Sequence, residues 1–227
     1  MNKIKKRNIN EEQLRIDVPL NIPLDISCEA KDWMCYEKEA KIMGYGVICG
    51  IDEAGRGPLA GPVCAAAVIM SDGLIDGLDD SKKLSAKKRA ELYNVIQEKA
   101  IGVSVGFADE KEIDEINILN ATFLAMKRAV DGLKIKPEYA LIDGNMIRGL
   151  DIPCRCIVKG DGLSSSIAAA SVIAKESRDA YMKELDGKYP MYGFAKHMGY
   201  PTKAHYEAIM RYGISDCHRK SFLKKFL

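Results

Sequence analysis

The stretch GIDEAGRGPLAGP, residues 50–62, places two carboxylates, Asp52 and Glu53, directly before a glycine-rich segment that contains one arginine. Glycine-rich turns often receive phosphate groups, because their bare backbone N–H groups can approach an anion closely. Carboxylates repel phosphates unless a cation lies between them. The stretch therefore predicts a metal site beside a turn that contacts a sugar–phosphate backbone. A nucleoside triphosphatase is not favoured, since GRGPLAGP lacks the lysine of a Walker phosphate loop.

The composition is that of a globular protein. The chain has 227 residues, of which 47% are hydrophobic and 29% are charged, enough for one large domain or one domain with an appendage. Its longest apolar run, near residues 63–70, is too short to span a bilayer, and its basic N-terminus is not followed by the apolar stretch of a secretory signal. We therefore expect a cytoplasmic protein without membrane association, whose seven cysteines are reduced.

Short apolar segments alternate with amphipathic ones along most of the chain. The pattern predicts strands at 45–52, 61–70, 101–108, 139–143 and 155–158, and helices at 32–43, 86–100, 117–133 and 165–185. This order favours an α/β domain with a mixed sheet covered by helices. Residues 1–31 contain two prolines and no clear periodicity, which indicates an N-terminal arm of unknown role. From residue 193 onward the sequence predicts a helical C-terminal module.

Acidic residues lie where three of the predicted strands end. Asp52, followed by Glu53, ends the first strand; Asp143 ends the fourth; and Asp161 lies three residues beyond the fifth. A single aspartate at a strand end is usually a turn residue, but four gathered acids repel one another unless a cation binds between them. Because every donor is an oxygen, Mg²⁺ or Mn²⁺ is favoured over zinc. Asp52 and Glu53 can share one site only if the chain leaves the strand between them.

The C-terminal end is locally basic although the net charge of the chain is only +2. Residues 195–227 hold seven Lys or Arg against two Asp or Glu, together with all three histidines. Such a basic end is typical of phosphate binding. A solvated helical tail has the same charge pattern, so charge alone leaves both interpretations open.

A series of long motifs, in order along the chain, resembles type 2 ribonuclease H, the ribonuclease HII family. They are GIDEAGRGPLAGPV (50–63), DSKKLS (80–85), LIDGN (141–145), KGD (159–161), SIAAASVIAK (166–175), YGFAKHMGYPTKAH (192–205) and HRKSF (218–222). The resemblance covers about residues 44–222. It implies a ribonuclease H-like fold with a helical C-terminal extension. It also implies hydrolysis of the RNA strand of RNA–DNA hybrids and incision 5′ of ribonucleotides embedded in duplex DNA, a step of ribonucleotide excision repair, leaving 3′-hydroxyl and 5′-phosphate ends.

The resemblance also assigns roles to individual residues. The catalytic acids and ligands of two Mg²⁺ or Mn²⁺ ions fall on Asp52, Glu53, Asp143 and Asp161. Substrate contacts fall on Gly55, Arg56 and Gly57 for the ribose 2′-hydroxyl, on Tyr200 for stacking on the following deoxyribose, on Lys82, Lys83 and Lys159 for phosphates, and on Ser166 near a phosphate. Asp179 is the rival for the fourth acid. We discount it because it lies in mid-helix with Lys175 and Lys183 four residues away on either side.

One residue departs from the family pattern, and two alternative functions remain. The usual HKGY reads HMGY here, so Met198 replaces a basic residue and duplex affinity is expected to be lower. A non-catalytic nucleic-acid-binding protein on the same fold is disfavoured by the intact acidic set. The second alternative is a type 3 ribonuclease H, which resembles this family but cleaves single embedded ribonucleotides poorly, and a cleavage assay that compares a hybrid with a DNA duplex carrying one ribonucleotide separates the two. We expect a monomer with an arm (1–31), a catalytic domain (32–192) and a helical substrate-binding region (193–227).

Overall fold

A five-stranded mixed sheet forms the centre of the computed structural model, which describes residues 32–71 and 73–225. Its strands are β1 (Ile48–Ala54), β2 (Val63–Ile69), β3 (Gly102–Ala108), β4 (Tyr139–Asp143) and β5 (Cys154–Ile157), in the order β3-β2-β1-β4-β5. β2 is antiparallel to both β1 and β3, whereas β1, β4 and β5 run parallel. The parallel half is the part that matters for the site, because its strands end at the same edge. The predicted arm, residues 1–31, lies outside the described residues.

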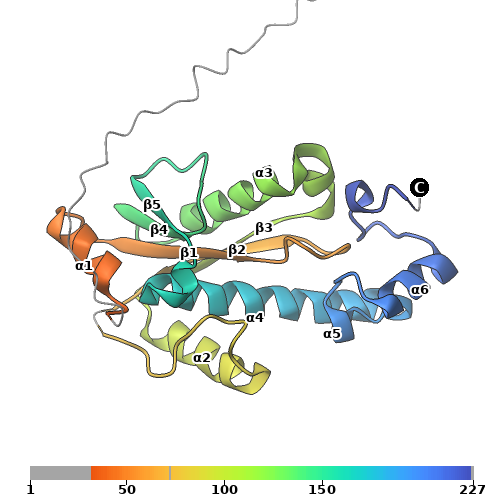
Figure 1. Cartoon of the computed structure of the whole chain (residues 1–227), viewed down its shortest axis with the longest axis horizontal. Coiled ribbons are helices and arrows are strands. Elements are labelled where there is room, and N and C mark those ends of the chain that lie inside the picture. The colour runs from red at the N-terminus through yellow and green to blue at the C-terminus, as the bar shows by residue number, and fades with distance from the viewer. Residues whose placement is uncertain (1–31, 72, 226–227) are drawn as a thin grey trace, which may run out of the picture.

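Helices cover both faces of the sheet, as predicted (Figure 1). They are α1 (Cys35–Ile42), α2 (Ala86–Lys99), α3 (Glu110–Asp131), α4 (Ser165–Lys188), α5 (Phe194–His197) and α6 (Lys203–Tyr212), with the 3₁₀ turns η2 (Gly160–Gly162), η3 (Pro190–Tyr192) and η4 (Lys220–Phe222). α3 packs on one face, and α4 packs on the other with α2 beneath it. Within the described residues, no helix is long and apolar enough to cross a membrane. The α/β class with a mixed sheet and flanking helices is thus confirmed.

Small side chains let β1 lie directly against the first turns of α4. A Cβ atom on Gly50 would lie 2.1 Å from the backbone carbonyl carbon of Ser166, so only glycine fits at this crossing. The facing stretch of α4, Ala168 to Ser171, is buried and carries no large side chain. This close approach sets the height of α4 above β1. It brings Ser171 beside Asp52, two residues along the strand from Gly50.

The third helix begins seven residues before the predicted start at residue 117. Asp109 and Glu112 form a capping box, in which each side chain accepts a hydrogen bond from the other residue's backbone N–H. Asn117 has φ +68° and divides the helix into two segments. Its side-chain oxygen accepts from the backbone N–H groups of Leu119 and Asn120 and so caps the second segment. The sequence pattern therefore found the second segment and missed the first.

One expectation about the cysteines is wrong. Five of them, Cys49, Cys64, Cys154, Cys156 and Cys217, are free thiols as predicted. Cys35, in the first turn of α1, is disulfide-bonded.

The C-terminal module is fastened to the glycine-rich segment by its backbone. Leu59 donates to the carbonyl of Gly199 (2.8 Å) and accepts from the backbone N–H of Arg219 (2.8 Å), and Ala60 forms an isolated β-bridge with His218. A separate apolar cluster joins the module to the end of α4: Leu59, Ala60, Met182, Leu185, Tyr192, Phe194, Ile209, Cys217 and Leu223. Segments 140 or more residues apart in sequence are thereby held in fixed register.

Replacing Gly50 with alanine tests the close contact between β1 and α4. The new methyl group has no room against the backbone of Ser166, so we expect a loss of about 1–3 kcal/mol in the free energy of unfolding. Gly187→Ala is the matched control, because an alanine Cβ there meets nothing within 4 Å and α4 should gain roughly 0.5–1 kcal/mol. Urea unfolding of both variants measures the difference. Equal stabilities would show that β1 and α4 separate easily.

Candidate active site

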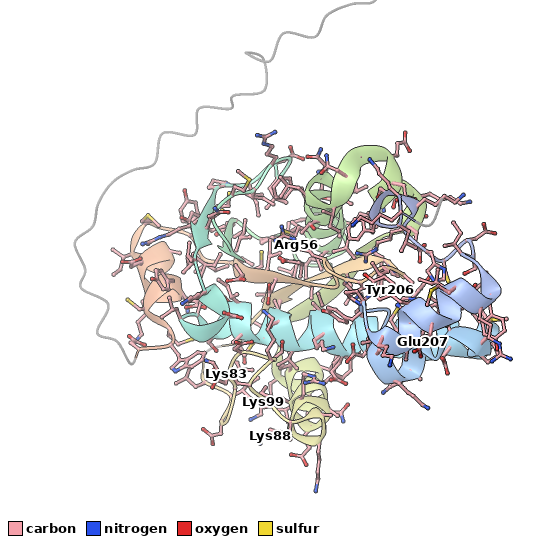
Figure 2. All side chains as sticks on the ribbon, turned by 45° about the vertical axis from the view of Figure 1, so that its right-hand side comes forward. Arg56, Lys83, Lys88, Lys99, Tyr206 and Glu207 are labelled. Atoms are coloured by element: carbon pink, nitrogen blue, oxygen red, sulfur yellow. The ribbon has the colours of Figure 1, made fainter. Side chains whose placement is uncertain are left out.

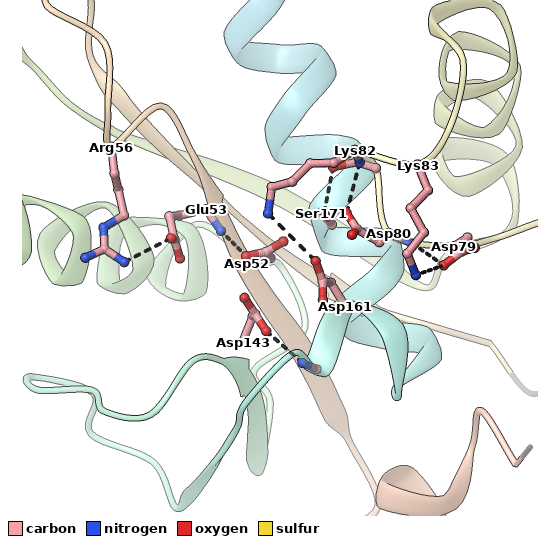
Figure 3. A network of polar contacts seen from close by, with 12 residues as sticks. Asp52, Glu53, Arg56, Asp79, Asp80, Lys82, Lys83, Asp143, Asp161 and Ser171 are labelled. Carbon is pink, nitrogen blue, oxygen red and sulfur yellow. Dashed lines mark hydrogen bonds and ion pairs between the residues drawn. The ribbon is translucent and has the colours of Figure 1, made fainter. Parts of the chain in front are cut away.

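Three carboxylates from separate elements meet at the carboxyl edge of the parallel strands (Figure 3). Asp52 lies in β1, Asp143 ends β4 and Asp161 lies in η2, which follows β5. Each offers one oxygen, and the three oxygens all lie within 4.8 Å of one another. Ile51 pairs with Ile142 where the parallel pairing of β1 and β4 ends, so Asp52 and Asp143 follow side by side. The sheet topology therefore builds the cluster that strand-end acids predicted.

Local hydrogen bonds fix the orientation of these carboxylates. The backbone N–H of Gly160 donates to Asp143 Oδ1 (2.7 Å) and ties the end of β4 to η2. The backbone N–H of Glu53 donates to Asp52 Oδ1 (2.7 Å), and the hydroxyl of Ser171 on α4, which hydrogen-bonds that of Ser81 (2.8 Å), lies nearby and lowers the pKa of Asp52. Lys159 enters η2 in the left-handed region (φ +58°) and turns the chain so that Asp161 faces the cluster. The carboxylates are thus held in place before any ligand binds.

The charges of the cluster are poorly compensated by the protein itself. Burial raises the pKa of Asp52 well above its ordinary value, and the nearby Glu53 and Asp143 raise it further. Burial also raises the pKa of Asp161, again with Asp143 adding to the effect. A divalent cation relieves such repulsion. Because the donors are all carboxylate oxygens within 4.8 Å, the residues fit a hard cation such as Mg²⁺ or Mn²⁺.

Glu53 reaches the edge of this cluster from the same strand. We expected the chain to leave the strand between Asp52 and Glu53. Instead, β1 continues to Ala54, which pairs with Cys64 of β2. The Oε1 atom of Glu53 lies 3.4 Å from a guanidinium nitrogen of Arg56. Burial raises the pKa of Glu53, Arg56 opposes this shift and Asp143 adds to it. Glu53 is thus coupled electrostatically to the three aspartates without being one of the three that meet within 4.8 Å.

Of the predicted phosphate contacts, Lys82 is the one that points into the cluster. Its Nζ lies 3.9 Å from Asp161 Oδ2. Burial alone would lower the pKa of Lys82, but the pKa is raised because Asp52, Asp161 and two further carboxylates lie nearby. Lys83 forms an ion pair with Asp79 instead (3.1 Å), at the rim of the site. In Figure 2, Lys83 lies on the α2 side of α4 and Arg56 lies on the opposite side of that helix.

Two other predicted positions and the discounted acid lie away from the aspartate cluster. Lys159 is exposed. Ser166 is buried and donates its hydroxyl proton to Glu37 Oε1 (2.7 Å), so its side chain is already committed within the protein. Asp179 is buried and paired with Lys175 (2.7 Å) and Arg89 (3.9 Å). The ion pair with Lys175 is one of the two that the helical spacing predicted for Asp179.

Two buried arginines hold the glycine-rich loop from behind. Arg178 on α4 is 1% exposed and Arg219, just before η4, is 0% exposed. Their guanidinium groups donate to backbone carbonyls at 2.7–3.2 Å: Arg178 to those of Ala60, Pro62 and Met198, and Arg219 to those of Gly55, Arg56 and Gly61. In a trans peptide the C=O and N–H groups point in opposite directions. Because the carbonyls of Gly55 and Arg56 point inward, the N–H groups of Arg56 and Gly57 point outward.

The structure requires a glycine at position 55, whereas Gly57 lies beside Tyr200. Gly55 has φ +93°, and a Cβ atom there would lie 1.9 Å from Nε of Arg178, so the loop packs directly on that side chain. A Cβ atom on Gly57 would lie 3.6 Å from the ring of Tyr200. Tyr200 is 41% exposed, and the Arg178 guanidinium lies 6.0 Å from the centre of its ring. The structure therefore brings together the loop and the tyrosine that the sequence predicted as one reading surface.

Sequence reasoning did not single out Ser171, Arg178 or Arg219 as site residues. Each lies in or beside a quoted motif, yet residue type pointed elsewhere: Ser171 belongs to a small-residue helix face, and an arginine in a helix or a basic tail is usually exposed. Met198, which replaces the usual basic residue, has φ +50° and packs half-buried against the C-terminal apolar cluster.

Comparisons with known proteins give one consistent result. The family model described as ribonuclease HII matches residues 49–225. The ribonuclease HII of Acetivibrio thermocellus is 59% identical over 196 residues, covering 86% of this chain and 77% of the relative. That of Clostridioides difficile is 51% identical over 224 residues, covering 98% and 82%. The crystal structure of ribonuclease H2 from Pyrococcus horikoshii superposes with a TM-score of 0.66 at 26% identity, over 79% of this chain and 96% of that one, which confirms the ribonuclease H-like fold.

Neutralising one buried carboxylate should stabilise the metal-free protein. Asp52→Asn keeps the side-chain volume and removes like-charge repulsion, so in EDTA we expect the variant to unfold a few degrees above wild type, since 1 kcal/mol is worth about 2–4 °C at this size. The advantage should shrink as pH falls, because wild-type Asp52, whose pKa is raised in the folded state, then takes up a proton.

Adding Mn²⁺ should reverse the order of the two proteins. Wild type gains stability by binding the ion, and the variant has lost a ligand, so its melting temperature should rise less. Scanning calorimetry with and without Mn²⁺ makes both comparisons. A variant that melts lower than wild type in EDTA would mean that the carboxylates do not repel one another in the folded protein.

Proposed function

The chain belongs to the ribonuclease HII family, and from this premise we propose that its three-aspartate cluster is the centre at which RNA phosphodiesters are hydrolysed. Members of this family are metal-dependent endoribonucleases that act on RNA in RNA–DNA hybrids. The observation that carries the proposal is the convergence of Asp52, Asp143 and Asp161 within 4.8 Å at one sheet edge. We further propose that the enzyme incises 5′ of ribonucleotides embedded in duplex DNA, within ribonucleotide excision repair, leaving 3′-hydroxyl and 5′-phosphate ends.

The cluster and its neighbours divide the work at the scissile phosphate. Asp52, Asp143 and Asp161 hold the divalent ions, with Glu53 completing the acidic set at the edge. When bound, two Mg²⁺ or Mn²⁺ ions polarise the phosphate and lower the pKa of the attacking water. Lys82 carries its ammonium group 3.9 Å from Asp161 and is placed to contact a phosphate oxygen. Lys83 and Lys159, at the rim, contact neighbouring phosphates.

Selection of RNA rests on the loop and Tyr200. The 2′-hydroxyl is the group that separates RNA from DNA, and it both donates and accepts hydrogen bonds. The outward N–H groups of Arg56 and Gly57 are the donors that would contact a ribose oxygen. The exposed ring of Tyr200, next to Gly57, offers a face on which the following deoxyribose stacks. Ser166, although buried here, stays a candidate for a contact near the phosphate.

The remaining proposals concern organisation and setting. Residues 32–192 form the catalytic domain and 193–227 the helical substrate-binding region, of which 226–227 lie outside the described residues. The arm, residues 1–31, has no assigned role. We propose that the protein acts as a cytoplasmic monomer. The type 3 ribonuclease H that the motifs left as an alternative is not favoured, because the matching family model and the relatives named above are ribonuclease HII.

Asp143→Asn should abolish cleavage while leaving the fold intact. The amide keeps the volume and an acceptor for the Gly160 N–H but loses the charge that a metal ligand supplies. We expect a fall of more than about a hundredfold, since outer-shell partners alone are worth about 10–100-fold. The assay uses an RNA–DNA hybrid and a DNA duplex with one ribonucleotide, each with Mg²⁺, with Mn²⁺ and with EDTA. Near wild-type cleavage by the variant, or activity that persists in EDTA, would remove the cluster from the mechanism.

Tyr200→Ala should damage incision at a single embedded ribonucleotide more than cleavage of a continuous hybrid. A lone ribonucleotide offers one junction, whereas other registers compensate in a hybrid. Stacking on an aromatic ring is worth about 1–3 kcal/mol, so the single-site rate should fall by roughly tenfold to a hundredfold. The ratio of the two rates at fixed salt and metal is the measurement. Equal losses on both substrates would mean that junction reading lies elsewhere.

A further inference from the structure

Two buried histidines of the C-terminal module face each other behind Tyr200, away from the aspartate cluster. His205 lies on α6 and His218 lies between α6 and η4. Both are buried, and their Nε2 atoms are 3.2 Å apart. The other ring nitrogen of His205, Nδ1, lies 3.0 Å from the backbone carbonyl oxygen of Tyr200. That carbonyl belongs to the residue proposed to read the junction.

The contacts of these rings allow one assignment of their protons. A carbonyl oxygen only accepts, so Nδ1 of His205 carries the proton. Burial lowers the pKa of His205, and it lowers that of His218 to about 4, so both rings are neutral at pH 7. Nε2 of His205 is therefore bare and accepts from Nε2–H of His218. Nδ1 of His218 in turn accepts from the backbone N–H (3.1 Å) and the hydroxyl (2.9 Å) of Ser215. The hydrogen bonds run in one direction, from Ser215 to Tyr200.

The segment that ends in Tyr200 is held at three successive carbonyls by three different elements. The carbonyl of Met198 accepts from Arg178 of α4 (3.0 Å), and that of Gly199 accepts from the N–H of Leu59 in the glycine-rich stretch (2.8 Å). The carbonyl of Tyr200 accepts from His205 of α6 (3.0 Å) and also from the backbone N–H of Thr202 (2.8 Å), so His205 is its one side-chain donor among the described residues. Met198 and Gly199 both have positive φ, at +50° and +79°. Such conformations persist where the surroundings over-determine them, and they cluster at functional sites.

The surroundings of the two histidines are apolar enough that a polar pair there is costly. The ring of His218 lies 4.7 Å from that of Tyr192, and the ring of His205 lies 5.4 Å from that of Phe194. Buried polar groups in such places stabilise a protein no better than apolar groups of similar shape, but they fix one geometry. If His205 and His218 served packing alone, no hydrogen bond from His205 to the carbonyl of Tyr200 would be needed.

We propose that His205, oriented by His218 and Ser215, is a positioning residue that fixes Tyr200 against the glycine-rich loop and so sets discrimination at an RNA–DNA junction. The inference rests on the proposed role of Tyr200. Because the ring of Tyr200 is exposed and its backbone is the anchored part, the direction of the ring follows the carbonyl that His205 holds. His205 touches neither the reacting phosphate nor the metal ligands. Its effect therefore reaches the substrate through Tyr200.

The first test reads the protons directly in the wild-type protein. In water a neutral histidine mostly carries its proton on Nε2, whereas the hydrogen bonds here require Nδ1–H in His205 and Nε2–H in His218. Nitrogen-15 chemical shifts of the ring atoms at pH 7 distinguish the two tautomers. We expect opposite tautomers in the two residues. Nε2–H in both, or a charged ring in either, would overturn the directed chain without any substitution.

The second test separates the two hydrogen bonds of His205. His205→Asn places an amide N–H where Nδ1 lies and keeps the donor to Tyr200, whereas His205→Gln reaches toward His218 and loses that donor. We expect the Gln variant to lower the ratio of single-ribonucleotide incision to hybrid cleavage by roughly three- to tenfold, the worth of one hydrogen bond, and the Asn variant to keep it within about twofold. His197→Asn is the matched control. The rings of His197 and His205 stack with their centres 4.6 Å apart, but the Nε2 atom of His197 hydrogen-bonds the carbonyl of Tyr192 and not that of Tyr200.

The outcomes distinguish this inference from the proposed function. Tyr200→Ala is measured alone and combined with His205→Gln. If Tyr200→Ala lowers the ratio and His205→Gln adds nothing to it, His205 acts through Tyr200. If Tyr200→Ala lowers the ratio while His205→Gln changes both substrates equally, or Asn is as harmful as Gln, the positioning role is overturned and the reading role stands. An unchanged ratio in Tyr200→Ala overturns both. Should the Gln variant not fold, the tautomer measurement still decides.

Discussion

The rest of the site depends on one constraint, the burial of two arginines beneath the glycine-rich loop. The guanidinium groups of Arg178 and Arg219 donate six hydrogen bonds to backbone carbonyls. A buried cation is costly unless dipoles or charges surround it. Burial, together with the charge of Arg178, lowers the pKa of Arg219 to about 9, and Glu110 opposes that shift. The carbonyl oxygens of the loop provide the nearest negative charge density. The loop therefore takes the shape that surrounds two cations, and its outward N–H groups follow from that shape.

The glycine-rich loop and Asp52 are linked by β1 and α4. β1 bears Asp52 and leads directly into Gly55, while α4 bears Ser171 beside Asp52 and Arg178 behind Gly55. Ser171 and Arg178 are seven residues apart, about 10 Å along one helix. Because a strand and a helix are stiff over this length, the distance between the proposed scissile phosphate and the proposed ribose contact is built into the scaffold. Sites on such elements are held more exactly than sites on free loops.

The position of the acids could be predicted from the sequence because it depends on a local pattern, in which short apolar segments are each followed by an aspartate. The class of fold and the meeting of Asp52, Asp143 and Asp161 followed from that pattern. The continuation of β1 through Glu53 did not, because pairing with β2 decides where a strand ends. The burial of Arg219 within a basic tail could not be predicted either. Counting charges gives the sign of a segment, whereas burial depends on the tertiary contacts that surround each side chain.

Attraction and selection are carried by different groups in this protein. Charge draws any nucleic-acid backbone, DNA as readily as RNA, so lysines such as Lys82 supply affinity and not choice. On the proposed function, choice rests on neutral groups: the N–H groups of Arg56 and Gly57 and the ring of Tyr200. Neutral hydrogen bonds discriminate only where their geometry is fixed, since a donor that can turn away satisfies itself with water. Arg178 and Arg219 hold the geometry of the loop, and in our proposal His205 holds that of the tyrosine. On the proposed function, the specificity of the site would therefore be set mainly by buried residues behind the surface that binds the substrate.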